Sequence, residues 1–97
     1  MDEMQEYADN IASAIENSNV VLVVSTLKAG NMILDIVQKL MMARGFLFKR
    51  YGADTVFVDG NWIRLVTHEN EHEKCLGLRD YMRFDYRFDT RRRYKNG

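Results

Sequence analysis

Residues 19–27 read Asn-Val-Val-Leu-Val-Val-Ser-Thr-Leu and contain five consecutive apolar residues, four of which are valine. Valine is branched at Cβ and favours strands, and an unbroken apolar run is typical of a strand buried on both faces. Such strands lie at the centre of parallel or mixed sheets that helices cover. The stretch therefore predicts an α/β fold with this strand at its centre.

Amphipathic helical patterns precede and follow this strand. In residues 2–16 and again in residues 31–44, apolar side chains recur every three or four positions and so share one helical face. The first stripe contains Met4, Tyr7, Ala8, Ile11, Ala12 and Ile15, and the second contains Met32, Ile33, Ile36, Val37, Leu40 and Met41. Gly45 is the expected C-cap of the second helix, because glycine adopts positive φ without steric cost. The pattern predicts two helices.

The second half of the chain is rich in strand formers. Residues 46–48 suggest a short strand, and residues 55–58 and 61–67 flank Asp59-Gly60. This dipeptide is typical of a type I′ hairpin turn, whose two central residues both need positive φ. The middle of the chain therefore predicts a β-hairpin.

Residues 82–89 alternate apolar residues with charged ones, with Met82, Phe84, Tyr86 and Phe88 on one face. A period of two is typical of a half-buried strand, here with a charged outer face suited to a sheet edge. We expect this strand to pair in parallel with residues 20–25. The fold prediction is thus two helices packed on a small mixed β-sheet of four to five strands that includes the hairpin.

The length and composition predict one domain. The chain has 97 residues, 46% of them hydrophobic, and a formal net charge of zero. Its charges are unevenly placed: residues 1–17 carry five acids and no base, whereas residues 76–97 carry six arginines and one lysine against three aspartates. We expect a single α/β domain over residues 1–90 and a flexible basic tail over residues 91–97.

Cellular location is predicted from cysteine use and from segments that the sequence lacks. Cys75 is the only cysteine, so no internal disulfide forms, which is typical of a reducing compartment. The acidic N-terminus does not resemble a signal peptide, and no apolar run is long enough to span a membrane. We expect a cytoplasmic protein without membrane contact. Nothing around Cys75 resembles a nucleophile elbow, so core packing is its expected role.

One short motif has the spacing of a zinc site. His68-Glu69-Asn70-Glu71-His72 reads His-Glu-x-x-His, which on a helix places two imidazoles beside Zn²⁺ and a glutamate beside the metal-bound water. Here the motif directly follows a strand and lies in a polar run, which is typical of a solvated acidic loop. A zinc-dependent hydrolase using His68, Glu69 and His72 is therefore an alternative hypothesis. Its third ligand would be Glu73, Asp80 or Asp85.

The basic C-terminal part favours a binding function. Its candidate contact residues for nucleic acid or an acidic protein surface are Arg79, Arg83, Arg87, Arg91, Arg92, Arg93 and Lys95. Arginines can hold phosphates while neighbouring aromatic rings stack on bases. Alternation in residues 82–89 places the aromatic side chains on the core face, so we expect phosphate contacts without base readout.

Our leading hypothesis is a non-catalytic intracellular binding or accessory protein that needs no cofactor and no metal. A further alternative is a self-associating structural module, a homodimer that pairs through residues 82–88 as an exposed edge strand.

The order of the elements resembles the core of P-loop ATPases, especially phage terminase large subunits and helicase-like motors. Residues 58–67 resemble the Asn/Asp-Gly hairpin of that family, and residues 76–85 resemble its Leu-Arg-Gly segment and the strand that ends in a magnesium-binding aspartate. Here Leu76 stands where the family has arginine, and Tyr86 stands where it has the glutamate that activates water. Asp85 occupies the metal-binding position.

The chain also lacks the glycine- and lysine-containing phosphate loop of that family. Gly30 stands alone, without a Gly-Lys-Ser/Thr sequence, and predicts an ordinary strand-to-helix connection. The resemblance thus implies a degenerate, phage-like core that does not hydrolyse ATP. The resemblance also implies that such a core could retain an affinity for nucleic acid or for a partner of a motor.

Overall fold

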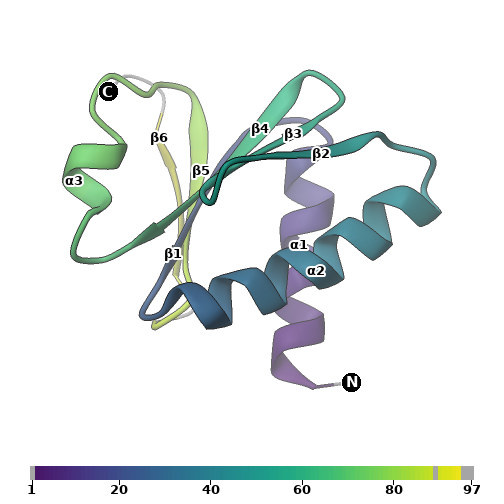
Figure 1. Ribbon diagram of the computed structural model, residues 1–97, viewed down its shortest axis with the longest axis horizontal. Coiled ribbons are helices and arrows are strands. Elements are labelled where there is room, and N and C mark those ends of the chain that lie inside the picture. Colours follow the sequence, from purple (N-terminus) through teal and green to yellow (C-terminus); the bar gives the residue numbers. More distant parts are fainter. Residues whose placement is uncertain (1, 89, 95–97) are drawn as a thin grey trace.

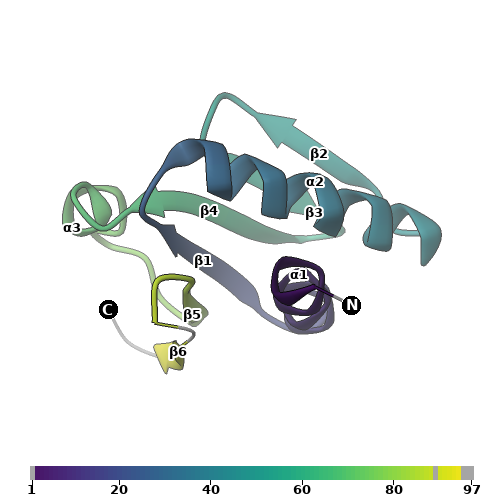
Figure 2. The ribbon, with the colours of Figure 1, turned by 90° about the horizontal axis from the view of Figure 1, so that it is seen from below.

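The valine-rich strand lies inside a six-stranded mixed sheet. The structure is a computed structural model that describes residues 2–88 and 90–94. The chain order is α1 (Glu3–Ile15), β1 (Asn19–Val24), α2 (Leu27–Ala43), β2 (Phe48–Tyr51), β3 (Thr55–Val58), β4 (Asn61–Thr67), α3 (Glu71–Lys74), β5 (Tyr81–Asp85) and β6 (Thr90–Tyr94). The strands are ordered β2-β3-β4-β1-β5-β6, so β2 and β6 form the two edges (Figure 2).

The prediction for β1 is confirmed. Val20 pairs with Ile63 of β4 on one side and with Met82 of β5 on the other, and both pairings are parallel. The five apolar residues of β1 have no exposed surface because both sheet faces are covered. Helices α1 and α2 cover one face, and α3 lies on the opposite side (Figure 1). The connection from β1 to β4 and the connection from β4 to β5 cross the sheet in opposite directions. Two connections of the same handedness that cross in opposite directions must pass over opposite faces, which places α2 and α3 on different sides of the sheet.

Helix α2 begins four residues earlier than its apolar stripe indicated. The Thr26 hydroxyl accepts a hydrogen bond from the Ala29 N–H and caps the helix at Leu27. At the other end Gly45 has φ of 86°, and the Phe46 N–H donates to the Met41 carbonyl. This is the Schellman arrangement. The predicted C-cap is therefore confirmed, whereas the start was missed because a threonine cap needs no apolar periodicity.

The predicted hairpin is also confirmed. Asp59 and Gly60 both have positive φ, of 48° and 93°, and they join β3 to β4 in antiparallel register. The third strand of this part, β2, lies at Phe48–Tyr51 rather than at residues 46–48. It pairs antiparallel with β3 and completes that end of the sheet.

The C-terminal part differs most from the prediction. β5 ends at Asp85, and residues 86–88 turn into an antiparallel strand, β6, where the sequence indicated the start of a tail. The expected edge strand at residues 82–88 is wrong, because β5 is flanked by β1 and β6. Counting α3 and β6, the fold has three helices and six strands within the described residues, instead of two and four to five. None of these helices is both long and apolar enough to cross a membrane.

Candidate nucleic-acid interface

Three consecutive arginines lie on the outer edge of the sheet. Arg91, Arg92 and Arg93 belong to β6 and are exposed. Arg91 and Arg93 stand opposite Phe84 and Met82, whose side chains pack on the face that α1 covers. Since successive strand residues point to opposite faces, Arg92 lies on the other face, opposite Arg83. The edge therefore presents guanidinium groups on both of its faces.

Two of these arginines contact the rest of the domain. The Arg93 Nη1 donates to Ser18 Oγ at 2.9 Å, which ties β6 to the turn between α1 and β1. The guanidinium of Arg91 lies 5.8 Å from the ring centroid of Phe84, within cation–π distance. These contacts orient the edge, and guanidinium groups with five N–H donors each can still bind further acceptors.

The turn before β6 exposes an aromatic ring. Phe88 is 65% exposed, and the Arg87 guanidinium lies 4.5 Å from its ring centroid. The alternating pattern placed Phe88 in the core, and this prediction is wrong. The chain leaves the strand after Asp85, because the carboxylate of Asp85 accepts a hydrogen bond from the Arg87 N–H at 3.1 Å. An aspartate, whose carboxylate can accept a hydrogen bond from the backbone N–H two residues later and so form a turn, was the signal that could have revealed it.

Asp85 lies on the sheet face that was expected to meet solvent, but it is 2% exposed. Arg83 and Arg87 both reach its Oδ2, at 3.3 and 3.4 Å. Arg83 also binds the carboxylate of Glu71 on α3 with two nitrogens. Two acids therefore balance Arg83, whose role in this structure is to join α3 to β5.

The remaining predicted contact residues flank the edge. Arg79 is exposed and lies two residues before Tyr81, whose register partner is Tyr94 at the end of β6. Arg79 and Arg87 therefore lie near opposite ends of the edge. Lys95 lies outside the described residues.

The His-Glu-x-x-His motif does not form a helical metal face. Helix α3 begins at Glu71, so His68 lies in the turn before it while His72 lies within it. Both histidines line a cavity of about 460 Å³ beside Cys75. Within residues 2–88 and 90–94, no three His, Cys, Asp or Glu side chains are grouped to hold a metal ion. The geometry gives the zinc hypothesis no support.

Cys75 has the environment of a packing residue. It is partly buried against the cluster of Val21, Val23 and Val66. Burial, with a smaller contribution from the Glu71 carboxylate, raises the pKa of its thiol. A nucleophilic cysteine needs the opposite change, a lower pKa that gives the thiolate.

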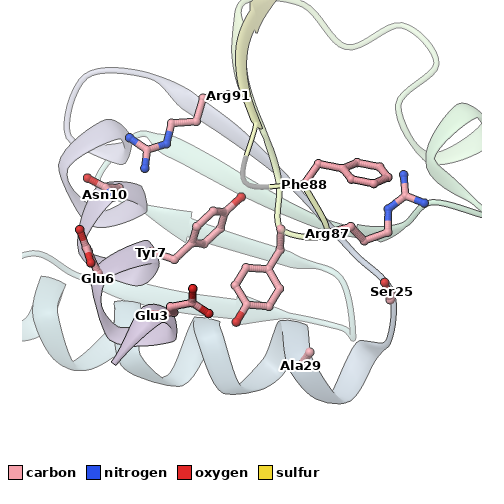
Figure 3. Close-up of a pocket in the computed structure, with 10 residues that line it drawn as sticks. Glu3, Glu6, Tyr7, Asn10, Ser25, Ala29, Arg87, Phe88 and Arg91 are labelled. Carbon is pink, nitrogen blue, oxygen red and sulfur yellow. The ribbon is translucent and has the colours of Figure 1, made fainter. Parts of the chain in front are cut away.

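A larger cavity of about 660 Å³ lies where β1 and β5 end. Glu3, Glu6 and Tyr7 of α1 line one side, and residues 86–88 together with Arg91 line the other (Figure 3). The strands β1 and β5 pair in parallel, and in open α/β sheets ligands bind outside the carboxyl ends of the strands. This cavity has no signal in the sequence, because it is formed by segments about 80 residues apart in the chain.

The functional assignment depends on these residues, because one fold serves many activities. The resemblance of residues 58–67 and 76–85 to P-loop ATPase cores stays a prediction. Comparisons of the chain with protein-family models, with curated proteins and with solved structures found no match.

Proposed function

We propose that this chain is a non-catalytic cytoplasmic binding protein whose β6 edge and preceding turn hold single-stranded nucleic acid. The observation that supports the proposal most is the row of exposed guanidinium groups at residues 91–93 on an edge strand, directly after the exposed ring of Phe88. Both features lie within a few residues of one another, in one surface segment.

The two parts of this segment suit the two parts of a nucleic acid strand. Guanidinium groups pair with phosphates and release bound counterions, which gives affinity without sequence preference. An exposed aromatic ring stacks on a base, which is worth about 1–3 kcal/mol per base. Phe88 adds a base contact that the sequence pattern did not predict.

A single strand fits this segment better than a duplex. Stacking on Phe88 needs a base that is not already stacked between neighbours, and in a duplex such a base must first be flipped out. The guanidinium groups of Arg91 and Arg92 point to opposite faces of β6. A flexible backbone can follow both faces, whereas a rigid duplex presents its phosphates along fixed lines.

The same arginines disfavour the self-association hypothesis at this edge. Pairing two β6 strands would bring six arginines from two copies side by side. Like charges across a strand pair are destabilising, and charged residues are a common device against edge-to-edge pairing.

The test is a comparison of ligand classes by fluorescence anisotropy. Labelled 12-mers of deoxythymidylate and uridylate are titrated with the protein at low salt, beside a duplex of the same length and a labelled polyglutamate peptide. We expect the single strands to bind more tightly than the duplex and than polyglutamate. Equal or tighter binding of polyglutamate would assign the edge to an acidic protein partner. Absence of binding to all four ligands would reject the proposed function.

A further inference from the structure

One short segment, residues 68–80, covers the second face of the sheet, and we call it the strap. It contains α3, joins β4 to β5 and lies at the margin of the molecule, away from α1 and α2 (Figure 1). None of its residues is buried, and from the strap only Cys75 and Leu78 pack on the apolar cluster of this face. On the other face, α1 and α2 bury five residues each. Apolar burial therefore contributes little to the attachment of the strap.

Charged side chains make the main attachments of the strap. Glu71, the first residue of α3, binds Arg83 of β5 through two nitrogens. Lys74, the last residue of α3, places its Nζ 2.8 Å from Asp54 Oδ2. The side chains of both ion pairs reach solvent, with exposed fractions between 20% and 43%. Ion pairs in contact with solvent are weakened by salt, so the attachment should depend on ionic strength.

The attached strap also buries a donor that has no acceptor. Arg64 of β4 lies beneath α3, where its Nη1 donates a long hydrogen bond of 3.4 Å to the Lys74 carbonyl. The Nε of the same guanidinium is buried and has no hydrogen-bond partner among the residues that the structure describes. An unpaired buried donor disfavours the state that buries it, and water could reach this nitrogen once the strap detached. This cost opposes the attached position.

We propose that the strap detaches from the sheet as one unit while the rest of the domain stays folded, and that the two ion pairs of α3 control how often it does so. Segments with few buried apolar contacts open locally at a small fraction of the free energy of global unfolding. Detachment exposes the Cys75 thiol together with Val21 and Val23 beneath it. The strap thus controls solvent access to the second face of the sheet.

Amide hydrogen exchange followed by NMR measures this opening residue by residue. Three hydrogen-bonded amides report on the strap: the Lys74 N–H donates to the Asn70 carbonyl, that of Cys75 to the Glu71 carbonyl and that of Leu78 to the Cys75 carbonyl. Because the strap opens as one unit, we expect the three amides to share one protection factor, well below that of the β1 amides.

Salt tests the role of the ion pairs in the wild-type protein. Raising NaCl from about 0.01 to about 1 M shortens the screening length from about 30 to about 3 Å. One exposed ion pair changes an equilibrium constant by about 1.4- to 5-fold, so loss of both should lower the protection of the strap by about 2- to 25-fold. The protection of β1 should stay unchanged.

Two variants test each ion pair separately at low salt. Glu71→Gln and Lys74→Met should each lower the protection of the strap by about 1.4- to 5-fold and make it less dependent on salt. Glu73→Gln is the matched control, because it removes an exposed carboxylate of the same helix that has no ion-pair partner within the described residues. It should keep the wild-type protection.

Three results would overturn the proposal. Protection that changed neither with salt nor in the two variants would show that the ion pairs do not hold the strap. Three unequal protection factors would show independent fraying instead of one unit. A parallel loss of protection in β1 would show that the whole domain unfolds.

Discussion

Arg92 on β6 lies directly opposite Arg83 on β5 in the antiparallel register. Like charges in that relation are destabilising unless one is neutralised. Arg83 binds Glu71 through two nitrogens and also reaches Asp85, so its charge is balanced inside the domain. The positive charge of Arg92 is thereby left to the outer surface. This arrangement separates arginines that build the fold from arginines that can meet a partner.

The buried carboxylate of Asp85 should be important for stability. Asp85→Asn keeps the shape but removes the charge that Arg83 and Arg87 share. Since Arg83 keeps Glu71 and both arginines reach water, we expect a loss of about 1–3 kcal/mol in the free energy of unfolding. Urea denaturation measures it. Asp35→Asn breaks the exposed pair with Arg50 and should cost less than about 1 kcal/mol. Equal costs would contradict the role of Asp85.

Phe88 should affect binding and leave the fold intact. Because its ring is exposed, Phe88→Ala should change the free energy of unfolding by less than about 0.5 kcal/mol. It should weaken binding of a deoxythymidylate 12-mer by about 1–3 kcal/mol if the ring stacks on a base. Phe57→Ala removes another exposed ring, near the opposite sheet edge, and should leave binding unchanged. Similar losses in both variants would remove the specific role of Phe88.

The ion pair between Asp54 and Lys74 predicts a pH dependence of stability. The Lys74 ammonium, 2.8 Å from Asp54 Oδ2, lowers the pKa of that carboxyl below its ordinary value of 3.8. A lowered folded-state pKa contributes stability above the unfolded-state value, and the contribution is lost as pH falls through the folded-state pKa. Asp54→Asn should thus cost less than about 1 kcal/mol near neutral pH and progressively less below about pH 4.

Urea denaturation at several pH values measures the cost of Asp54→Asn. In a Lys74→Met background the same substitution should cost less and depend less on pH, because only the smaller contributions, the hydrogen bond from Thr55 and the charge of Arg64, then remain. If the cost of Asp54→Asn stayed constant down to the lowest pH at which the protein still folds, the ion pair with Lys74 would be excluded as its cause.

Cys75 should react slowly in the folded protein. Burial raises the pKa of its thiol, so the thiolate is scarce near neutral pH. Alkylation by iodoacetamide at about pH 8 should be slower than that of free cysteine, and unfolding in urea should restore the ordinary rate. Mass spectrometry follows the reaction. A folded-state rate above that of free cysteine would contradict the packing role and revive a nucleophilic one.

The sequence predicted the elements whose signals are local. The valine run of β1, the helical patterns of α1 and α2 and the Asp59-Gly60 turn each follow from neighbouring residues. These elements are confirmed, although Met32 of the predicted α2 stripe is exposed. The end of β5 was missed because the alternating strand pattern continued to residue 89 and outweighed a second local signal, an aspartate whose carboxylate accepts a hydrogen bond from the Arg87 N–H and turns the chain. The cavity was missed because it depends on how α1 and β6 meet across the sheet.

The central claim is that Arg91, Arg92 and Arg93 contact nucleic acid phosphates. It is tested most directly by the salt dependence of binding to a deoxythymidylate 12-mer, in the wild type and in the Arg91→Ala/Arg92→Ala/Arg93→Ala variant. For single strands the logarithm of affinity falls with a slope of about −0.7 per phosphate contact against the logarithm of salt concentration.

We predict that the triple variant binds more weakly at low salt and that its slope is shallower by about 2. A variant with Lys39, Lys49 and Arg50 changed to alanine loses the same charge on α2 and β2, and should keep the wild-type slope. An unchanged affinity and slope in the Arg91–Arg93 variant would contradict the account.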